Sequence, residues 1–433
     1  MLTNLSFFIG KEETTQLFSR LLEHSPDLFE ISFEHISNEG LRLIASSHCA
    51  PSLRNIECRV NENALELIKS ICKSYPSLRE LIVGNDDFKL SGDEIIHTAV
   101  EYCPLIEVLS IHMWHLTDVG LDKLATLHTL TELKVTSDDC TRAAVQRVIE
   151  ANPNLTLLRV DVADIVDEAL VRCIGHSCSN LTILLLYRSA PSSALVSTNA
   201  FCDLFRGCPL LEYFQLRQQT EMPNTAVRAM FQCCTHLTEV TLFVGKLTEE
   251  SLLDVEPVLS TNYPSLTTLR VTGDGNEGEG LAYSAFRSIF TYCINLQEVH
   301  ISNCNQITDG IIKVMAQYCI SLDELTLMDC GSVSMSGVLE VARRCTKLKS
   351  LVLYDMPISD EVFIQLSHHF HGLIRFDCSD GLVTKAGLLV LLEGCTGLSF
   401  LTLRGPVAKP LLPTLDLGKL KQIYSHIKLE IAL

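Results

Sequence analysis

The sequence predicts an α/β solenoid, in which similar strand-turn-helix units stack into one long parallel sheet lined on its outer side by helices. Three observations lead to this prediction. A short apolar motif recurs along the chain, its end alternates apolar and polar residues, and the segment after it has apolar residues at helical spacing. With 433 residues, 47% of them hydrophobic, the chain can form a substantial core.

The recurring motif is L-x-x-L-x-L, in which Ile, Val, Phe or Cys can replace Leu. It occurs sixteen times, at intervals of 24 to 30 residues. So narrow a spacing over so many occurrences is typical of repeat proteins. The motif begins at Leu2, Leu28, Leu53, Leu78, Ile106, Leu130, Leu155, Leu181, Leu211, Leu237, Leu266, Leu296, Leu322, Leu348, Leu373 and Leu398.

Each element of a unit follows from its residues. The L-x-L end alternates with a period of two, which predicts a short strand with one buried face. The segment that follows, as in residues 310–319, has the apolar spacing of a helix. Between them an apolar residue precedes Ser or Thr, and an acidic residue often comes next, as in Ile307-Thr308-Asp309. We expect the hydroxyl to cap the helix and the acidic residue to interact favourably with the helix dipole.

No single unit can bury its own apolar face, so neighbouring units must stack. The strands then line a concave face, and the stack curves because helices are wider than strands. This is a leucine-rich-repeat solenoid, or horseshoe, of about 16 units of about 26 residues. We expect the array over residues 1–405. Prolines break the pattern in residues 406–433, and we expect a closing segment there, with a last helix near 415–426 and a strand at 427–431.

The cysteines have a fixed place in the repeat. Of the 18, eight lie three residues before the motif, where the helix ends: Cys103, Cys178, Cys208, Cys234, Cys293, Cys319, Cys345 and Cys395. We expect a small buried corner there, which Cys fills as a compact hydrophobe. A metal site is the alternative, but the chain has no Cys-x-x-Cys pair, and equivalent positions in successive units do not surround one point. We therefore expect no metal and no cofactor.

The composition excludes several classes of partner. A formal net charge of −18 disfavours nucleic acids and anionic membranes, because it repels phosphate at long range. No apolar run approaches the roughly 20 residues that span a bilayer. The start of the chain lacks the basic region of a signal peptide. We expect a cytoplasmic protein, with the nucleus as a second compartment.

Two motifs allow a chemical interpretation. Residues 273–278 spell G-x-G-x-x-G, as in dinucleotide-binding sites, but the acidic Asp274 and Glu277 would repel a pyrophosphate. His368, His369 and His371 lie close in sequence without a Cys or carboxylate pattern, and a solvated helix end explains them better than a metal site. We expect no catalytic residues and no enzymatic activity.

Residues 293–311, CINLQEVHISNCNQITDGI, resemble the cysteine-containing class of leucine-rich repeats, whose consensus is close to C-x-x-L-x-x-L-x-L-x-x-C-x-x-[IL]-[ST]-D-x-G-[LI]. Residues 320–330 and 116–121 match in part. This class is typical of F-box/leucine-rich-repeat proteins, the substrate receptors of SCF-type cullin-RING ubiquitin ligases. It also occurs in the antagonist-of-mitotic-exit proteins, which are similar but lack an F-box. The resemblance implies a protein that binds other proteins.

An F-box is a helical module that precedes the repeats and binds the adaptor Skp1. Residues 2–7 already have the pattern of a repeat strand and residues 12–24 that of its helix, so no F-box is visible. We expect Skp1 and a cullin as partners if an F-box lies upstream of Met1.

The second, fourth and sixth residues after each motif start are expected to face the concave side. In the first units these positions are mostly acidic, as in Glu30, Glu57 and Glu80. In the middle they become aromatic, basic or long, which is typical of binding hot spots. Any concave sheet contains some aromatic residues, and this remains the alternative. The residues predicted to bind a protein substrate are Tyr187, Tyr213, Gln215, Arg217, Phe243, Arg270, His300, Met328 and Tyr354.

Three functions remain. The first is a substrate receptor of an SCF-type ligase, which holds a protein for ubiquitination and proteasomal degradation. The second is a stand-alone regulatory scaffold without ligase coupling. The third is a small-molecule co-receptor like the plant hormone-sensing F-box proteins. It is the weakest, because Arg217 and Arg270 are too few to form the basic floor of such a site.

Overall fold

The fold was analysed in a computed structural model of the chain. It describes residues 4–7, 24, 29–33, 38–46, 53–60, 65–85, 91–112, 116–137, 139–162, 165–187, 196–217, 224–244, 265–273, 283–305, 307–356, 358–408, 411 and 416–432. The chain separates into two compact units. Unit 1 comprises Met1–Leu211 and Leu216–Gln219, and unit 2 comprises Glu212–Gln215 and Thr220–Leu433.

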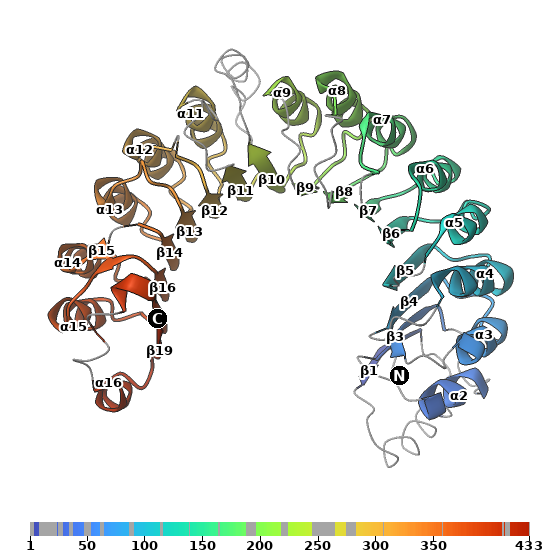
Figure 1. The fold of residues 1–433 in the computed structure, drawn as a ribbon, viewed down its shortest axis with the longest axis horizontal. Coiled ribbons are helices and arrows are strands. Elements are labelled where there is room, and N and C mark those ends of the chain that lie inside the picture. Colours follow the sequence, from blue (N-terminus) through green and yellow to red (C-terminus); the bar gives the residue numbers. More distant parts are fainter. Residues whose placement is uncertain are drawn as a thin grey trace. The chain divides into compact units, whose positions relative to one another are not determined.

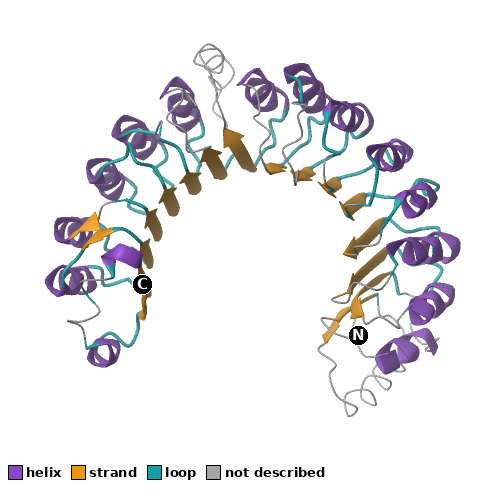
Figure 2. Ribbon diagram, viewed as in Figure 1, coloured by secondary structure: helices purple, strands orange, loops and turns teal. Residues whose placement is uncertain are grey.

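Unit 1 contains a parallel sheet with helices along one side (Figures 1 and 2). Consecutive strands pair in sequence order, with equivalent repeat positions opposite one another. The strands are β1 Asn4–Phe7, β2 Glu30–Phe33, β3 Asn55–Val60, β4 Glu80–Asn85, β5 Val108–His112, β6 Glu132–Thr136, β7 Leu157–Asp161 and β8 Ile183–Tyr187. The helices are α2 Asn38–Ser46, α3 Leu65–Ser74, α4 Gly92–Tyr102, α5 Asp118–Leu124, α6 Arg142–Ala151, α7 Glu168–Ser177 and α8 Thr198–Gly207.

Unit 2 has the same construction. Its strands are β9 Tyr213–Arg217, of which residues 213–215 fall in this unit, β10 Glu239–Val244, β11 Thr268–Gly273, β12 Glu298–Ser302, β13 Glu324–Met328, β14 Ser350–Tyr354, β16 Arg375–Cys378, β18 Phe400–Arg404 and β19 Lys428–Ala432. A two-stranded ladder joins β15 Ile358–Ser359 to β17 Gly381–Leu382. The helices are α9 Asn224–Cys233, α11 Tyr283–Tyr292, α12 Asp309–Tyr318, α13 Met335–Arg344, α14 Asp360–His369, α15 Lys385–Gly394, the short η2 Gly405–Val407 and α16 Leu417–Ile423.

The predicted leucine-rich-repeat solenoid is therefore confirmed as the fold class. Within residues 406–433 the structure has α16 and β19, and β19 pairs in parallel with β18, so the sheet continues by one strand beyond the sixteen motifs.

The motif residues form the core of each unit. In the L-x-x-L-x-L motif that begins at Leu296, the three apolar motif residues, Leu296, Val299 and Ile301, are fully buried. The residues between them are at least partly exposed. Burying one such aliphatic side chain stabilises the fold by about 1.5–3 kcal/mol. Because the same alternation recurs in the other strands, as in β6, β7 and β8, it defines one buried face and one open face of the sheet.

An aspartate in the first turn of α4, α5, α12 and α14 links neighbouring repeats. The Asp309 carboxylate, in the first turn of α12, accepts hydrogen bonds from the backbone N–H of Ser334 (2.7 Å) and from its hydroxyl (2.6 Å). Ser334 is the N-cap of α13, one repeat further on. The same arrangement joins Asp93 to Thr117, Asp118 to Thr141 and Asp360 to Thr384. The acidic residue, predicted only to complement the helix dipole, therefore also joins adjacent repeats.

The predicted hydroxyl caps are present at some positions and absent at others. Thr117, Ser334 and Thr384 accept a hydrogen bond from a backbone N–H in the first turn of their helices. Thr308 and Ser359 make no such side-chain capping bond, so the prediction is wrong for these two. Met335 stands in the helix before Ser359 at the position where α12 has Asp309, so no carboxylate is available there for Ser359.

The carboxylate link explains a recurrent glycine. A Cβ atom on Gly337, in the first turn of α13, would lie 2.7 Å from Oδ1 of Asp309. A Cβ on Gly387 would overlap the Asp360 carboxylate in the same way. The space that a side chain would need is occupied by the preceding repeat, so only glycine fits without a shift.

The cysteines before the motif are buried as predicted, and all eight are inaccessible to solvent. The structure adds a polar contact at five of them, because the thiols of Cys103, Cys208, Cys319, Cys345 and Cys395 donate weak hydrogen bonds to backbone carbonyls of the preceding repeat. Cys208 Sγ lies 3.3 Å from the carbonyl oxygen of Cys178, and Cys103 Sγ lies 3.5 Å from that of Cys72. Asn152 takes this position after α6, where its amide bonds the Val148 carbonyl and the Leu130 N–H. The position thus satisfies backbone groups at the helix end.

Candidate protein-binding surface

The open face of each sheet, called the sheet face below, is formed by the second, fourth and sixth residues after each motif start. The described helices pack on the opposite side of the sheet (Figure 2). In unit 2 the strand register aligns the fourth residues into one row across neighbouring strands, which are about 4.8 Å apart. This row is Gln215, Thr241, Arg270, His300, Thr326, Val352, Asp377, Thr402 and Glu430.

The nine residues predicted to bind a substrate are divided between the units. Tyr187 and Arg217 fall in unit 1, and the other seven in unit 2. The side chains of Arg217 and Phe243 lie outside the described residues. In unit 2 the Tyr213 hydroxyl is 3.2 Å from Oε1 of Gln215, and Met328 pairs with Tyr354 in the sixth-residue row. The structure thus places Arg270 and His300 in one row and Met328 and Tyr354 in another.

Arg270 lies among carboxylates. It forms ion pairs with Glu239 and Glu298, the second-residue side chains of the strands on either side, and Nη2 is 3.3 Å from Glu298 Oε2. His300 Nε2 is 3.8 Å from the same oxygen of Glu298. Burial, and then the positive charge of Arg270, lower the pKa of His300. Since Glu324 also acts on His300, three carboxylates and one arginine make this part of the sheet face acidic.

A second group of side chains lies further along unit 2 and was not predicted from the sequence. It comprises Ser350, Arg375, Asp377, Phe400 and Lys428, on β14, β16, β18 and β19, and is called the C-terminal cluster below. Asp377 is only 1% exposed, and its Oδ2 accepts hydrogen bonds from Arg375 Nη2 (2.6 Å) and Nε (2.9 Å). Ser350, Arg375, Asp377 and Phe400 are second or fourth residues after a motif start, so the repeat numbering could have identified them, whereas Lys428 is placed only by its register with Phe400.

Two atoms of the C-terminal cluster lack a hydrogen-bond partner among the described residues. They are Oδ1 of Asp377 and Oγ of Ser350, both of which are inaccessible to solvent. Buried polar groups in folded proteins are nearly always hydrogen-bonded. Tyr354 is close enough for Asp377 to affect it: burial, followed by the Asp377 charge, raises the pKa of Tyr354.

The sheet face of unit 1 is acidic at its start, as the sequence predicts. Asn55 Nδ2 donates a 2.7 Å hydrogen bond to Glu80, and burial together with Glu132, Glu30 and Glu57 raises the pKa of Glu80. Towards the end of the unit, Arg159 lies 4.9 Å from the ring centroid of Tyr187 and pairs with Asp161. A cation stacked on Tyr187 in this way covers part of the ring that a partner would otherwise contact.

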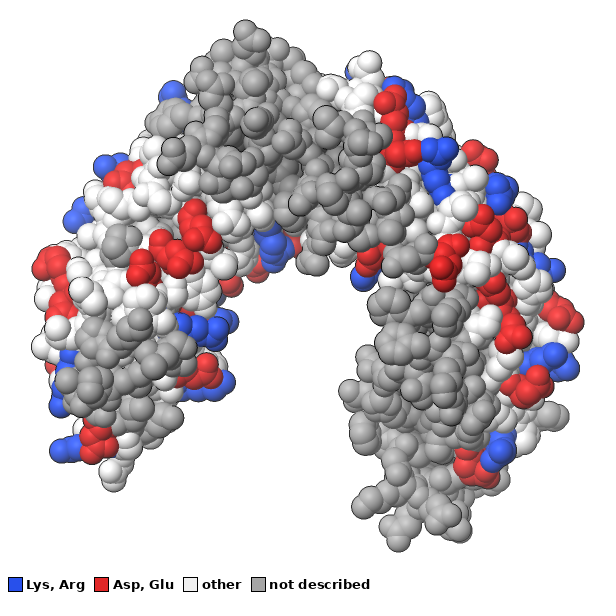
Figure 3. Space-filling view, viewed as in Figure 1, with Lys and Arg blue, Asp and Glu red and all other residues white. Residues whose placement is uncertain are grey.

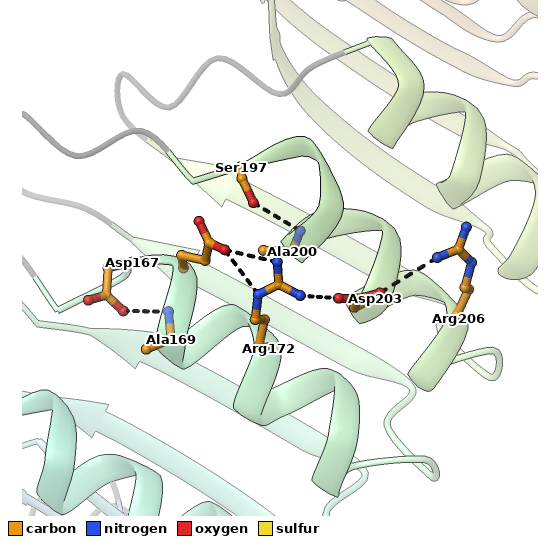
Figure 4. Close-up of polar contacts among 8 residues, drawn as sticks. Asp167, Ala169, Arg172, Ser197, Ala200, Asp203 and Arg206 are labelled. Atoms are coloured by element: carbon orange, nitrogen blue, oxygen red, sulfur yellow. Dashed lines mark hydrogen bonds and ion pairs between the residues drawn. The ribbon is translucent and has the colours of Figure 1, made fainter.

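The helix side of unit 1 is bound together by charged residues (Figure 4). Arg172 on α7 pairs with Glu168 on the same helix and with Asp203 on α8, and Arg206 lies 3.6 Å from Asp203. Asp167 and Ser197 cap the two helices. These contacts hold neighbouring repeats together. In the view of Figure 3, acidic and basic side chains are mixed over the described surface of this side.

A cavity of about 400 Å³ also lies on the helix side of unit 1, lined by α3, α4 and the start of α5. Its charged lining residues are Glu66, Lys69, Asp93, Glu94 and Glu101, and His97 also lines it. Asp93 is engaged by Thr117 and Gly120, so it contributes to the repeat links described above.

The glycine-rich motif at residues 273–278 lies partly within the described residues, and the three histidines at 368, 369 and 371 lie wholly within them. A Cβ on Gly273 would overlap the carbonyl oxygen of Asn303, so a close backbone approach accounts for this glycine, while residues 274–282 lie outside the described residues. His368 and His369 end α14, and His371 follows it. Across the described ranges, no group of three or more His, Cys, Asp or Glu side chains is arranged to hold a metal ion. Nor does any helix in these ranges have the length and apolar character to cross a membrane.

No protein-family model and no curated protein matches the sequence. Among solved structures, an LRR protein of Leptospira interrogans is 14% identical with a TM-score of 0.50, and the match covers 98% of this chain and 100% of that chain. Yeast Rad7, in its complex with Elc1, is 16% identical with a TM-score of 0.44, over 87% of this chain and 84% of that chain. TLR13, in its complex with ssRNA13, is 14% identical with a TM-score of 0.45, over 88% of this chain and 57% of that chain. At these identities the likeness concerns the fold, which is that of a leucine-rich-repeat protein.

Proposed function

We propose that this protein is a non-enzymatic interaction solenoid that holds a protein partner on its sheet face. The proposal rests on the fourth-residue row of unit 2. Its polar and charged residues lie in register on a face that the described helices leave open. Arg270 and His300 in this row, with Met328 and Tyr354 beside it, have the composition of interface hot spots. Binding, rather than chemistry, is what such a surface supports.

Within this role we propose a substrate receptor of an SCF-type cullin-RING ubiquitin ligase. Support comes from residues 293–311, which resemble the repeats of F-box/leucine-rich-repeat proteins. The partner on the sheet face would then be ubiquitinated by associated subunits and degraded, in the cytoplasm or the nucleus. Coupling requires an F-box or another surface that binds Skp1.

The alternative is a stand-alone regulatory scaffold. It is supported by the same resemblance, because the cysteine-containing repeat class also occurs in the antagonist-of-mitotic-exit proteins, which lack an F-box.

Purification of the endogenous full-length protein, followed by blotting for Skp1 and a cullin, separates the two roles. Co-purification of both, at amounts comparable to the protein itself, supports the ligase role. Their absence, together with an upstream sequence that encodes no F-box, leaves the stand-alone scaffold.

The binding face is tested by substitution. We expect His300→Ala with Tyr354→Ala to remove partners that co-purify with the wild type, as measured by quantitative mass spectrometry. The matched control is Lys313→Ala, an exposed position on α12. Equal recovery of all partners by the wild type and both variants would exclude this part of the sheet face.

A further inference from the structure

The second-residue row of unit 2 changes sign along the sheet. After Tyr213, Glu239 and Thr268 come Glu298 and Glu324, then Ser350, and then Arg375, Phe400 and Lys428, each paired in register with the next. The row is thus acidic on β12 and β13 and basic on β16 and β19. At about 0.1 M salt, charges more than about 10 Å apart are largely screened, so a bound segment responds to the local charge more than to the net charge of the chain.

The basic part of the row is accessible and includes an exposed aromatic ring. Phe400 is 47% exposed, and the side chains of Arg375 and Lys428 on either side of it are 55% and 68% exposed. Lys428 is 3.1 Å from Glu430, but both side chains are well exposed, so this pair is weak and leaves the ammonium group available. A large apolar side chain between two cations favours a ligand that is apolar in the middle and acidic at both ends.

The two atoms without partners among the described residues lie next to this row. Ser350 is paired in register with Arg375, and the buried Asp377 is held by the same arginine. Oδ1 of Asp377 can only accept a hydrogen bond while it is ionised, whereas Oγ of Ser350 can donate or accept.

We propose that the C-terminal cluster binds an acidic segment of the partner protein, in which two carboxylate side chains flank an apolar residue. One carboxylate pairs with Arg375 and the other with Lys428, while the apolar side chain packs on Phe400. Arg375 and Lys428 are two strand spacings apart, about 10 Å. Successive side chains of an extended chain face opposite sides, so the two carboxylates and the apolar residue take alternate positions, which span about 13 Å and leave both carboxylates within reach of the long basic side chains. This inference rests on the proposed protein-binding role and adds the chemistry of the partner.

A peptide-binding experiment on the full chain tests this chemistry. The probe is a short fluorescein-labelled peptide, Ser-Glu-Ser-Phe-Ser-Glu-Ser, in which the two Glu residues flank Phe at alternate positions, and the matched peptide has Lys in place of each Glu. We expect fluorescence anisotropy to show saturable binding of the Glu peptide, weakened by salt, and no saturable binding of the Lys peptide. Equal binding of the two peptides, or no binding of the Glu peptide, overturns the proposal.

Substitutions locate the site. We expect Lys428→Glu and Phe400→Ala each to weaken binding of the Glu peptide at least about tenfold, and Lys428→Arg to retain it. Lys313→Glu, on α12, changes the net charge equally and should leave binding unchanged. Arg375→Ala would leave Asp377 buried without its partner, so Arg375 is tested in the double variant Arg375→Gln with Asp377→Asn, after its melting temperature is shown to be unchanged. Unaltered affinity in Lys428→Glu and Phe400→Ala contradicts the proposed location.

The protein-binding role of the sheet face and the acidic-segment site can be disproved independently. If cellular partners are lost on substitution of His300 and Tyr354 but not of Phe400 and Lys428, the sheet face binds proteins and the acidic-segment proposal is wrong. If the Glu peptide binds the C-terminal cluster while no partner depends on His300 or Tyr354, the site chemistry holds and the broader binding face is wrong.

Discussion

Asp309 and Ser334 are held together by two hydrogen bonds that cross from one repeat to the next. Oδ1 accepts the backbone N–H of Ser334 at 2.7 Å, and Oδ2 accepts its hydroxyl at 2.6 Å. The carboxylate thus satisfies a backbone donor at the start of α13, while Ser334 Oγ accepts a hydrogen bond from Ser336 N at 3.1 Å. The starts of α5, α6, α13 and α15 depend in this way on the repeat before them.

We expect Asp309→Ala to destabilise the helix it contacts more than its own. The substitution leaves the Ser334 N–H without its acceptor, a loss of about 1–3 kcal/mol in local stability. Hydrogen exchange should increase at residues 334–338, at the start of α13. Lys313→Ala, an exposed position on α12, is the control and should change stability by less than about 0.5 kcal/mol. Unchanged exchange at α13 would show that the link between repeats contributes nothing.

We expect Gly337→Ala to destabilise the protein although alanine is the better helix former by about 1 kcal/mol. The added Cβ would lie 2.7 Å from Oδ1 of Asp309, so the carboxylate or the helix must move. Urea unfolding should show a lower midpoint than the wild type. In an Asp309→Ala background the same substitution should be neutral or stabilising, and a penalty that persists there would point to another cause. Ser336→Ala, exposed on the same helix, is the control.

We expect stability to fall on the alkaline side of pH 9. Burial raises the pKa of Cys58, Cys208 and Cys293 from 9.0 to about 12. Between these values the unfolded thiol ionises and the folded one does not, so stability is complete below pH 9 and decreases up to about pH 12, by as much as about 1.4 kcal/mol per pH unit for each thiol. Urea midpoints across this range measure the slope. Cys293→Ala should make it shallower, and an identical slope would contradict the assignment. Below pH 8 the same thiols should resist alkylation in the folded protein.

We expect protonation of His300 to lower the free energy of unfolding at acidic pH. Burial, and then Arg270, lower its folded-state pKa below the ordinary 6.5, so the unfolded chain binds the proton first. The free energy of unfolding does not depend on this titration above pH 6.5, and it decreases as the pH falls through that value. Comparison of urea midpoints between pH 7 and pH 5 in the wild type and in His300→Gln isolates the contribution, and the variant should be less sensitive to pH. An NMR titration that places the His300 pKa at or above 6.5 would refute it.

Much of the fold could be predicted because the information is local. The period-two alternation of Val299 and Ile301 and the helical spacing in residues 310–319 require no knowledge of neighbouring repeats. The burial of the eight cysteines followed from their constant place before the motif. The same numbering placed Arg270 and His300 on the open face, but whether the predicted residues bind a partner stays a prediction.

What the sequence by itself determined is the repeat: its length, its strand and helix, and the side of the strand that each residue faces, all of which depend on periodicity within one unit. Only the tertiary structure decided which residues of successive repeats meet. Asp309 meets Ser334 and excludes a side chain at Gly337, and Arg375 covers Asp377 beside Phe400. These relationships depend on the register and separation of stacked strands and helices, to within an ångström or less. Periodicity sets which position faces a neighbour, but packing sets how closely the two approach.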